Sequence, residues 1–148
     1  MFELTLFNSI KIMINTKQRV LLVEDDAINA FVISKFLENT YTTTTTSNGV
    51  DALKTFKTMH FDAVLMDINL GDDRINGLDL MRSFRAAEMQ SDIPIIAVTA
   101  FIMRGDKEKL LDSGFNDYLA KPLERSQLLS TLEKHLNSTT NKENMTMV

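Results

Sequence analysis

The sequence predicts an α/β fold in which helices cover both faces of a parallel sheet. Two observations carry this prediction. Short apolar or β-branched segments alternate five times with segments of helical spacing. Three of the apolar segments, VLLV, AVLM and IIAV, contain no polar residue, as is typical of strands buried on both faces. The chain has 148 residues, a length that suits one domain with a single core.

We expect five strands, at Arg19–Val23, Tyr41–Ser47, Ala63–Met66, Ile95–Val98 and Tyr118–Ala120. The second contains five consecutive threonines at 42–46, which favours an edge strand because threonine is a strand former. Apolar residues at helical spacing follow each strand. They are Ile28, Phe31, Val32 and Phe36; then Val50, Leu53 and Phe56; then Leu78, Met81 and Phe84; then Leu110 and Leu111; and finally Leu128, Leu129, Leu132 and Leu136.

The predicted domain covers residues 19–136. Residues 1–18 form a leader that is either partly disordered or includes a mis-assigned start, because Met13 lies close before the first strand. The leader lacks the basic start and the cleavage site of a signal peptide. Residues 137–148, NSTTNKENMTMV, are polar and aperiodic and predict a frayed tail.

Composition excludes several classes of function. The formal net charge of −4 and the pI of about 5.1 give no general affinity for nucleic acids or membrane surfaces. The absence of cysteine excludes disulfides, thiol catalysis and cysteine–zinc sites, and it fits a cytoplasmic location. No apolar run approaches the length of a membrane span, so we expect no membrane association.

Polar residues follow four of the predicted strands. Glu24 and Asp25 follow the first strand, Asp67 the third, Thr99 the fourth and Lys121 the fifth. Because the carboxyl ends of parallel strands meet at one rim, these groups are expected to converge there. Singly, each has an ordinary structural explanation, but together they indicate a site.

The predicted chemistry follows from this donor set. Several carboxylates with no sulfur ligand suit a hard cation, most plausibly Mg²⁺, which would relieve the repulsion between adjacent acids. A magnesium ion beside a carboxylate and a lysine suits phosphoryl transfer. Asp26, the third acid of the run, is expected instead to cap the helix that follows.

The chain resembles the receiver domains of two-component response regulators over roughly residues 19–136. The resemblance rests on VLLVEDDAIN, VLMDINL, AVTA at 97–100 and YLAKP at 118–122, and the segment FIMRGDKEKLLDSGFNDYLAKP is similar to receivers of hybrid sensor kinases. It implies a flavodoxin-like, doubly wound five-stranded parallel sheet of strand order 2-1-3-4-5 with five helices.

The resemblance also implies residue roles. Asp67 would be the phosphoacceptor, and Glu24, Asp25, Asp67 and the backbone carbonyl of Asn69 would hold Mg²⁺. Lys121 would neutralise a phosphoryl oxygen, Thr99 would hydrogen-bond one after transfer, and Tyr118 would be the switch aromatic. The bond between Lys121 and Pro122 would be cis. Ala100 follows Thr99 at the site.

One segment departs from the family pattern, and one residue bears on the lifetime of the phosphate. GDDRIN lengthens the loop before Gly77, where Asp72, Asp73 and Arg74 are most simply solvated charges. Phe101, two positions after Thr99, either shields the phosphoryl group from water or contacts a partner. Asn69 stands where a haloacid-dehalogenase-like phosphatase needs a general acid, which argues against that class of enzyme.

We expect a phosphoacceptor signalling domain that is not an enzyme in its own right, although it would catalyse its own phosphorylation and slow dephosphorylation. Its donor would be a histidine kinase or a histidine phosphotransfer protein, and its output would be an unknown downstream protein. No direct DNA binding is expected, because only a polar tail follows the last helix. The alternatives are a phosphorelay intermediate and a receiver excised from a hybrid kinase.

Overall fold

The fold is a five-stranded parallel sheet, seen in a computed structural model that describes residues 2–6, 17–70, 77–87, 92–100 and 104–146, with backbone alone for 138–146. The strand order is β2-β1-β3-β4-β5, which confirms the predicted topology. The strands are β1 (Arg19–Val23), β2 (Thr42–Thr46), β3 (Ala63–Asp67), β4 (Ile95–Thr99) and β5 (Asp117–Ala120). Each lies within a residue or two of the segment predicted from composition.

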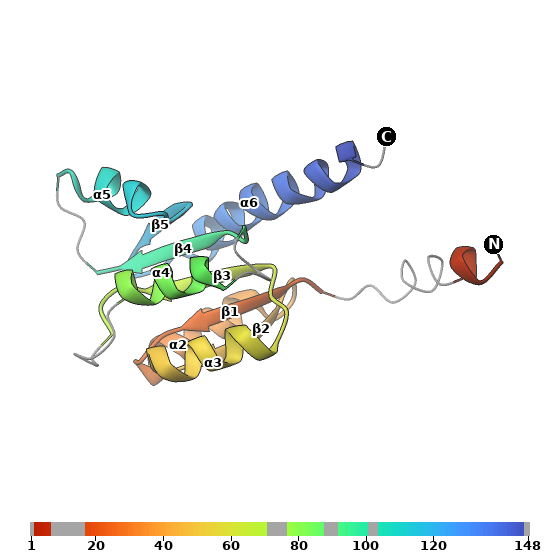
Figure 1. Cartoon of the computed structure of the whole chain (residues 1–148). Coiled ribbons are helices and arrows are strands. Elements are labelled where there is room, and N and C mark those ends of the chain that lie inside the picture. Colours follow the sequence, from red (N-terminus) through yellow and green to blue (C-terminus); the bar gives the residue numbers. More distant parts are fainter. Residues whose placement is uncertain (1, 7–16, 71–76, 88–91, 101–103, 147–148) are drawn as a thin grey trace.

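Helices cover both faces of this sheet (Figure 1). They are α2 (Ala27–Leu37), α3 (Gly49–Thr58), α4 (Gly77–Ala86), α5 (Asp106–Asp112) and α6 (Arg125–Thr146). A short helix at residues 2–6 adds a sixth to the five that were expected, within the segment predicted as a leader. Every helix that the structure describes is too short or too polar to cross a bilayer.

Alternate residues of the strands pack into two separate cores, one on each face of the sheet. Leu21, Val64 and Met66 join the core beneath α3, α4 and α5, where the Phe56 and Phe84 rings stack with centroids 4.2 Å apart. The core on the opposite face lies beneath α2 and α6 and contains Val20, Leu22, Ala30, Ile33, Leu37, Leu65, Leu128, Leu132 and Leu136. The sheet is therefore buried on both sides, as its uninterrupted apolar strands indicated.

The residues of α2 that face the core are not the ones whose spacing predicted this helix. Ile28 and Phe31 are 75% and 63% exposed, and Val32 is also exposed. The buried positions are Ala30, Ile33 and Leu37 instead. Two apolar stripes share this helix, and only one fits against the sheet.

The last helix extends beyond the predicted end of the domain. α6 continues to Thr146, so residues 137–146 are helical in the segment where the sequence predicted a polar, frayed tail. No glycine or proline follows Leu136, and nothing in the local sequence therefore stops the helix there.

A half-buried arginine joins three segments at the amino end of the sheet. Arg85 of α4 donates to the Ile93 carbonyl at 2.7 Å, to the Gly114 carbonyl at 3.0 Å and to Asn116 Oδ1 at 2.6 Å. Asn116 Oδ1 also accepts the backbone N–H of Ile95 at 2.8 Å. One guanidinium thus joins α4 to the start of β4 and to the connection between α5 and β5.

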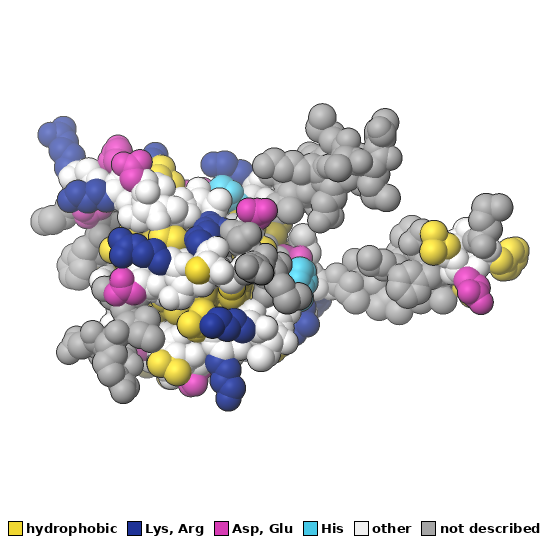
Figure 2. All heavy atoms as spheres, viewed as in Figure 1, with side chains coloured by type: hydrophobic (Ala, Val, Ile, Leu, Met, Phe, Trp, Pro, Cys, Tyr) yellow, Lys and Arg dark blue, Asp and Glu magenta, His cyan; other side chains and the backbone are white. Residues whose placement is uncertain are grey.

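Over the surface, charges of both signs are interspersed. Figure 2 shows Lys and Arg side chains among Asp and Glu on this face, with no large field of one sign. Together with the formal net charge of −4, this distribution gives no footprint for a nucleic-acid backbone on the face shown.

Candidate functional site

The polar groups predicted from the strand ends converge at the carboxyl end of the sheet. Pairing of Val23 with Met66 and of Asp67 with Val98 brings the ends of β1, β3 and β4 level with one another. Glu24 and Asp67 are each 2% exposed and Thr99 is 1% exposed. These three are the buried polar or charged side chains among the residues that the structure describes.

Lys121, which follows β5, is the cation between the buried acids. Its Nζ lies 2.8 Å from Asp67 Oδ2 and 2.8 Å from Glu24 Oε2. The contact with Asp67 is a hydrogen bond, and the contact with Glu24 is a close ion pair to the same ammonium. One cation therefore serves two buried acids.

Backbone N–H groups hold the two acids in place. Asp67 Oδ1 accepts from the N–H of Asn69 at 2.9 Å, and Glu24 Oε1 accepts from the N–H of Asp26 at 3.1 Å. The Asp26 side chain in turn accepts from the N–H of Asn29 at 2.8 Å at the start of α2, which confirms its predicted role as a helix cap.

Burial and charge act on the two ends of this cluster differently. Burial raises the pKa of Glu24, and the negative charge of Asp67 adds to this effect, against the lowering influence of Lys121 and of the Asp26 N–H. Burial alone would lower the pKa of Lys121, but its hydrogen bonds and charge interactions with Asp67 and Glu24 outweigh it and raise that pKa. Lys121 is therefore held as an ammonium, and Glu24 takes up a proton more readily than an ordinary glutamate does.

The acids have the composition of a site for a hard cation. Glu24, Asp25 and Asp67 can each offer one carboxylate oxygen within 4.8 Å of the others, and Asp25 is the exposed member. Three carboxylates face a single ammonium, so the cluster carries excess negative charge. Oxygen donors and excess negative charge fit Mg²⁺.

Thr99 and the residues after β5 complete the rim. The Thr99 carbonyl accepts the N–H of Lys121 at 2.8 Å, which fixes the end of β4 against the end of β5. The bond between Lys121 and Pro122 is cis, as the family resemblance implied. Ala100 is exposed beside Thr99.

The loop after β3 and the residues after β4 lie partly outside the described residues. Phe101 and the charged residues Asp72, Asp73 and Arg74 belong to those segments, so their proposed roles stay predictions.

Gly77, at the start of α4, packs closely against Ile68, the residue that follows Asp67. A Cβ added at position 77 would lie 2.6 Å from Ile68 Cα. A side chain at position 77 would therefore displace the loop that carries Asp67.

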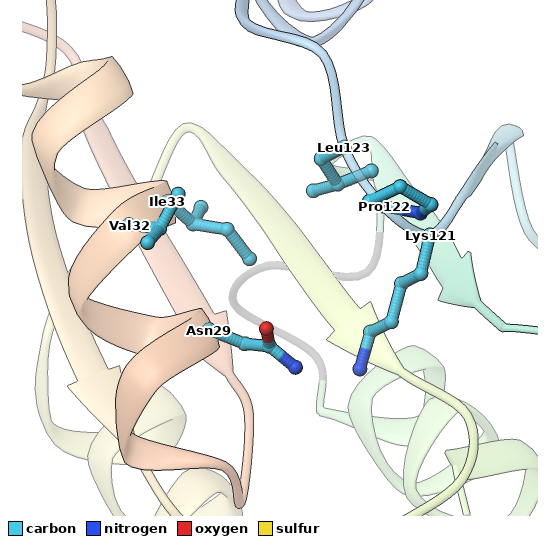
Figure 3. Close-up of a pocket in the computed structure, with 6 residues that line it drawn as sticks. All are labelled: Asn29, Val32, Ile33, Lys121, Pro122 and Leu123. Carbon is cyan, nitrogen blue, oxygen red and sulfur yellow. The ribbon is translucent and has the colours of Figure 1, made fainter.

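A cleft opens beside the site between α2 and the connection from β5 to α6. It encloses about 300 Å³ and is lined by Asn29, Val32, Ile33, Lys121, Pro122 and Leu123. Figure 3 shows the side chains of Asn29 and Lys121 on opposite walls, with their polar ends toward the same side. This cleft could not be predicted from the sequence, because its walls come from residues about ninety positions apart.

Tyr118, the predicted switch aromatic, is partly buried on β5. Its backbone N–H donates to Asp117 Oδ1 at 2.9 Å, and Lys107 Nζ lies 5.8 Å from the centre of its ring. The Asp117 carboxylate also meets His135 of α6, a contact that sequence reasoning did not find because the two residues are 18 positions apart.

Comparisons with known proteins agree with this architecture. Residues 20–133 match the response regulator receiver domain family. The chain is 34% identical to the polar-differentiation response regulator DivK of Brucella ovis over 118 residues. The aligned region covers 79% of this chain and 94% of that protein.

Solved structures give the same result. The receiver domain of sensor histidine kinase PA1611 from Pseudomonas aeruginosa, solved with magnesium in its active-site cleft, is 37% identical with a TM-score of 0.75, over 82% of this chain and 99% of that one. The chemotaxis protein CheY4 of Vibrio cholerae, 24% identical with a TM-score of 0.75 over 82% of this chain and 100% of that one, shares the fold. The sequence match, the strand order and these neighbours together show that the chain belongs to the response regulator receiver domain family.

Proposed function

We propose that this receiver takes a phosphoryl group onto Asp67 from a phosphohistidine of a histidine kinase or a histidine phosphotransfer protein. The observation that carries this proposal is the Asp67 carboxylate, almost fully buried yet placed at a strand end with an ammonium 2.8 Å away and two further acids beside it. A structural aspartate needs a cation but has no need of additional acids.

The transfer requires only the phosphohistidine and a proton from solvent. A carboxylate oxygen of Asp67 forms a bond to phosphorus as the phosphorus–nitrogen bond of the donor breaks, and the imidazole keeps the electron pair and takes a proton from water. Lys121 holds one carboxylate oxygen of Asp67 and would neutralise a phosphoryl oxygen. Glu24, Asp25, Asp67 and the carbonyl of Asn69 would hold Mg²⁺, which when bound neutralises phosphoryl charge.

We further propose that Thr99 and Tyr118 convert phosphorylation into a change of surface. The Thr99 hydroxyl would turn toward the phosphoryl group, and Tyr118 would fill the space that it leaves, which shifts a two-state equilibrium. The surface around α5, β5 and α6 would then present a different shape to a downstream protein.

The test is labelling with a small acyl phosphate in the presence of Mg²⁺. We expect one phosphoryl group per chain by intact mass, labile to hydroxylamine, and no labelling when Mg²⁺ is chelated before the acyl phosphate is added. Asp67→Asn should reduce labelling by at least a hundredfold because the nucleophile is gone. Asp112→Asn, at an exposed position on α5, is the matched control and should label normally. Full labelling of Asp67→Asn would overturn the assignment.

The donor remains to be identified. The relatives include a protein named as a response regulator and a receiver that belongs to a sensor kinase, so both a stand-alone receiver and a relay intermediate fit. Phosphotransfer from candidate kinases, followed by back-transfer to histidine phosphotransfer proteins, distinguishes them. Rapid back-transfer supports the relay, and retention of the label supports an output through protein binding.

A further inference from the structure

A single carboxylate connects α6 to the backbone of Tyr118. Asp117, the first residue of β5, accepts the Tyr118 N–H on Oδ1 at 2.9 Å and meets His135 Nε2 on Oδ2 at 2.9 Å. The His135 and Asp117 side chains are only 18% and 25% exposed, so water screens their contact weakly. A change at His135 therefore reaches Tyr118 through one intervening side chain.

The chain offers a natural reference for this contact. Its only other histidine is His60, whose Nε2 lies 3.7 Å from Asp62 Oδ1 and whose side chain is 72% exposed. That spacing is too long for a hydrogen bond, and solvent competes for both groups. Two histidine–carboxylate pairs of different tightness thus occur in one molecule.

The charges around the tight pair keep its acid ionised. Burial would raise the pKa of Asp117, but the His135 hydrogen bond, the Tyr118 N–H and the Lys134 ammonium together lower it. Lys134 Nζ, from the same helix as His135, is 3.7 Å from Asp117 Oδ2 and is 71% exposed. On the far side of Tyr118, Lys107 of α5 lies over the ring. Near neutral pH the proton on the imidazole is therefore the variable part of the contact.

We propose that His135 and Asp117 form a proton-sensitive positioning pair that holds the start of β5, and with it Tyr118, against α6. With the imidazole protonated, the contact is an ionic hydrogen bond, which is stronger than a neutral one. With the imidazole neutral, the contact weakens, or is lost where the proton resides on Nδ1. The contact is therefore strongest while Asp117 is ionised and the imidazole is protonated, and it weakens as the imidazole loses its proton.

The consequence for signalling rests on the proposed function. If Tyr118 reports the phosphorylated state, the pair biases the position of Tyr118 before any phosphate arrives. The same phosphoryl signal would then produce a different proportion of the active surface at pH 6 and at pH 8.

The first experiment uses the unphosphorylated, metal-free full chain. Nuclear magnetic resonance from pH 5 to 8.5 follows the ring signals of both histidines and the amide signal of Tyr118. We expect the Tyr118 amide to shift with the midpoint of His135 and with no step at the midpoint of His60. His135→Gln should remove the pH-dependent shift at Tyr118 while the rest of the spectrum stays folded, because glutamine can donate to Asp117 without titrating.

The matched control is His60→Gln, which should leave the Tyr118 titration unchanged. Asp117→Asn should also abolish the shift, and Lys134→Met should move its midpoint without removing it. A Tyr118 amide that ignores pH, or that titrates equally in His135→Gln, overturns the proposal. Because no phosphate is involved, failure of Asp67 labelling would leave this result intact.

The second experiment adds a beryllium fluoride phosphoryl mimic and compares pH 6 with pH 8. We expect the ratio of the apparent affinities for the mimic at pH 6 and at pH 8 to be about three times larger in the wild type than in His135→Gln. A change of about threefold corresponds to the weakening of one ionic hydrogen bond. Equal pH dependence in both proteins would overturn the coupling to the site.

Discussion

The two ends of the sheet hold their charged groups in different ways. At the amino end, the half-buried Arg85 guanidinium donates hydrogen bonds to two carbonyls and to the Asn116 side chain, and the charge of Asp92 also acts on it. At the carboxyl end, three acids gather around the single ammonium of Lys121. Between the two ends, residues 20–23 of β1, 63–66 of β3 and 95–98 of β4 are apolar and buried.

This difference agrees with a structural role for Arg85 and with the phosphoacceptor role proposed for the acid cluster. The Arg85 network uses neutral acceptors and joins three parts of the chain, which is what structural hydrogen bonds do. The acid cluster carries like charges in a buried setting, which lowers stability unless a cation relieves it. Charge imbalance, more than burial alone, identifies the functional end.

The largest effect should follow from removing the one cation of the acid cluster. Lys121→Met leaves Glu24 and Asp67 buried together without a counter-charge, and we expect the metal-free free energy of unfolding at pH 7 to fall by about 3 kcal/mol. Because the pKa of Glu24 is already raised, the folded variant binds a proton more tightly than the unfolded chain does. Part of the loss should therefore be recovered as the pH falls from 7 toward 5.

Urea unfolding of the wild type and of Lys121→Met at the two pH values measures this effect. Lys109→Met, at an exposed position on α5, is the control and should change stability little. A Lys121→Met protein as stable as the wild type at pH 7 would mean that the acids are not repelling one another in the folded state.

A smaller loss is expected at the amino end, without any effect on chemistry. Arg85→Met removes three hydrogen bonds from partly buried acceptors and should cost about 2 kcal/mol. Arg82→Met is the matched control on the same helix, because Arg82 meets Asp79 at 3.5 Å with both side chains exposed, and it should cost less than about 0.5 kcal/mol.

Thermal unfolding measures the stability of both arginine variants, and acyl-phosphate labelling measures their chemistry. Both should label at the wild-type rate. Slow labelling of a folded Arg85→Met protein would show that the two ends of the sheet are coupled, contrary to the separation argued above.

The smallest effect concerns the exposed acid. Magnesium at ten times its dissociation constant should stabilise the wild type by about 1.4 kcal/mol through mass action. Asp25→Ala should weaken that response while leaving the metal-free protein at least as stable, since an exposed like charge is removed from the cluster. Melting curves with and without Mg²⁺ give the answer, and an unchanged magnesium shift in Asp25→Ala would exclude Asp25 as a ligand.

Much of the fold was predictable from the sequence because buried strands appear in it as uninterrupted apolar runs. Uninterrupted apolar runs located β1, β3 and β4, and the threonine run located the edge strand β2. The buried face of α2 was not predictable in this way. Its two apolar stripes have similar helical spacing, and spacing alone does not decide which of Phe31 and Ile33 meets the sheet.

The candidate site was predictable to the extent that strand ends determine it. Glu24, Asp67 and Lys121 meet because parallel strands deliver their last residues to one rim, which topology alone requires. The contacts of Arg85 with Asn116 and of Asp117 with His135 were not predictable. They join residues 31 and 18 positions apart through packing of whole helices, and no local pattern records them.

The length of α6 has a mechanical consequence. Its 22 residues span roughly 33 Å at the usual helical rise, whereas the four residues of the neighbouring β5 span roughly 13 Å. The helix therefore continues well past the sheet, as Figure 1 shows. For a helix of this length, a tilt of about 10° at its packed first turns would displace the far end by about 6 Å.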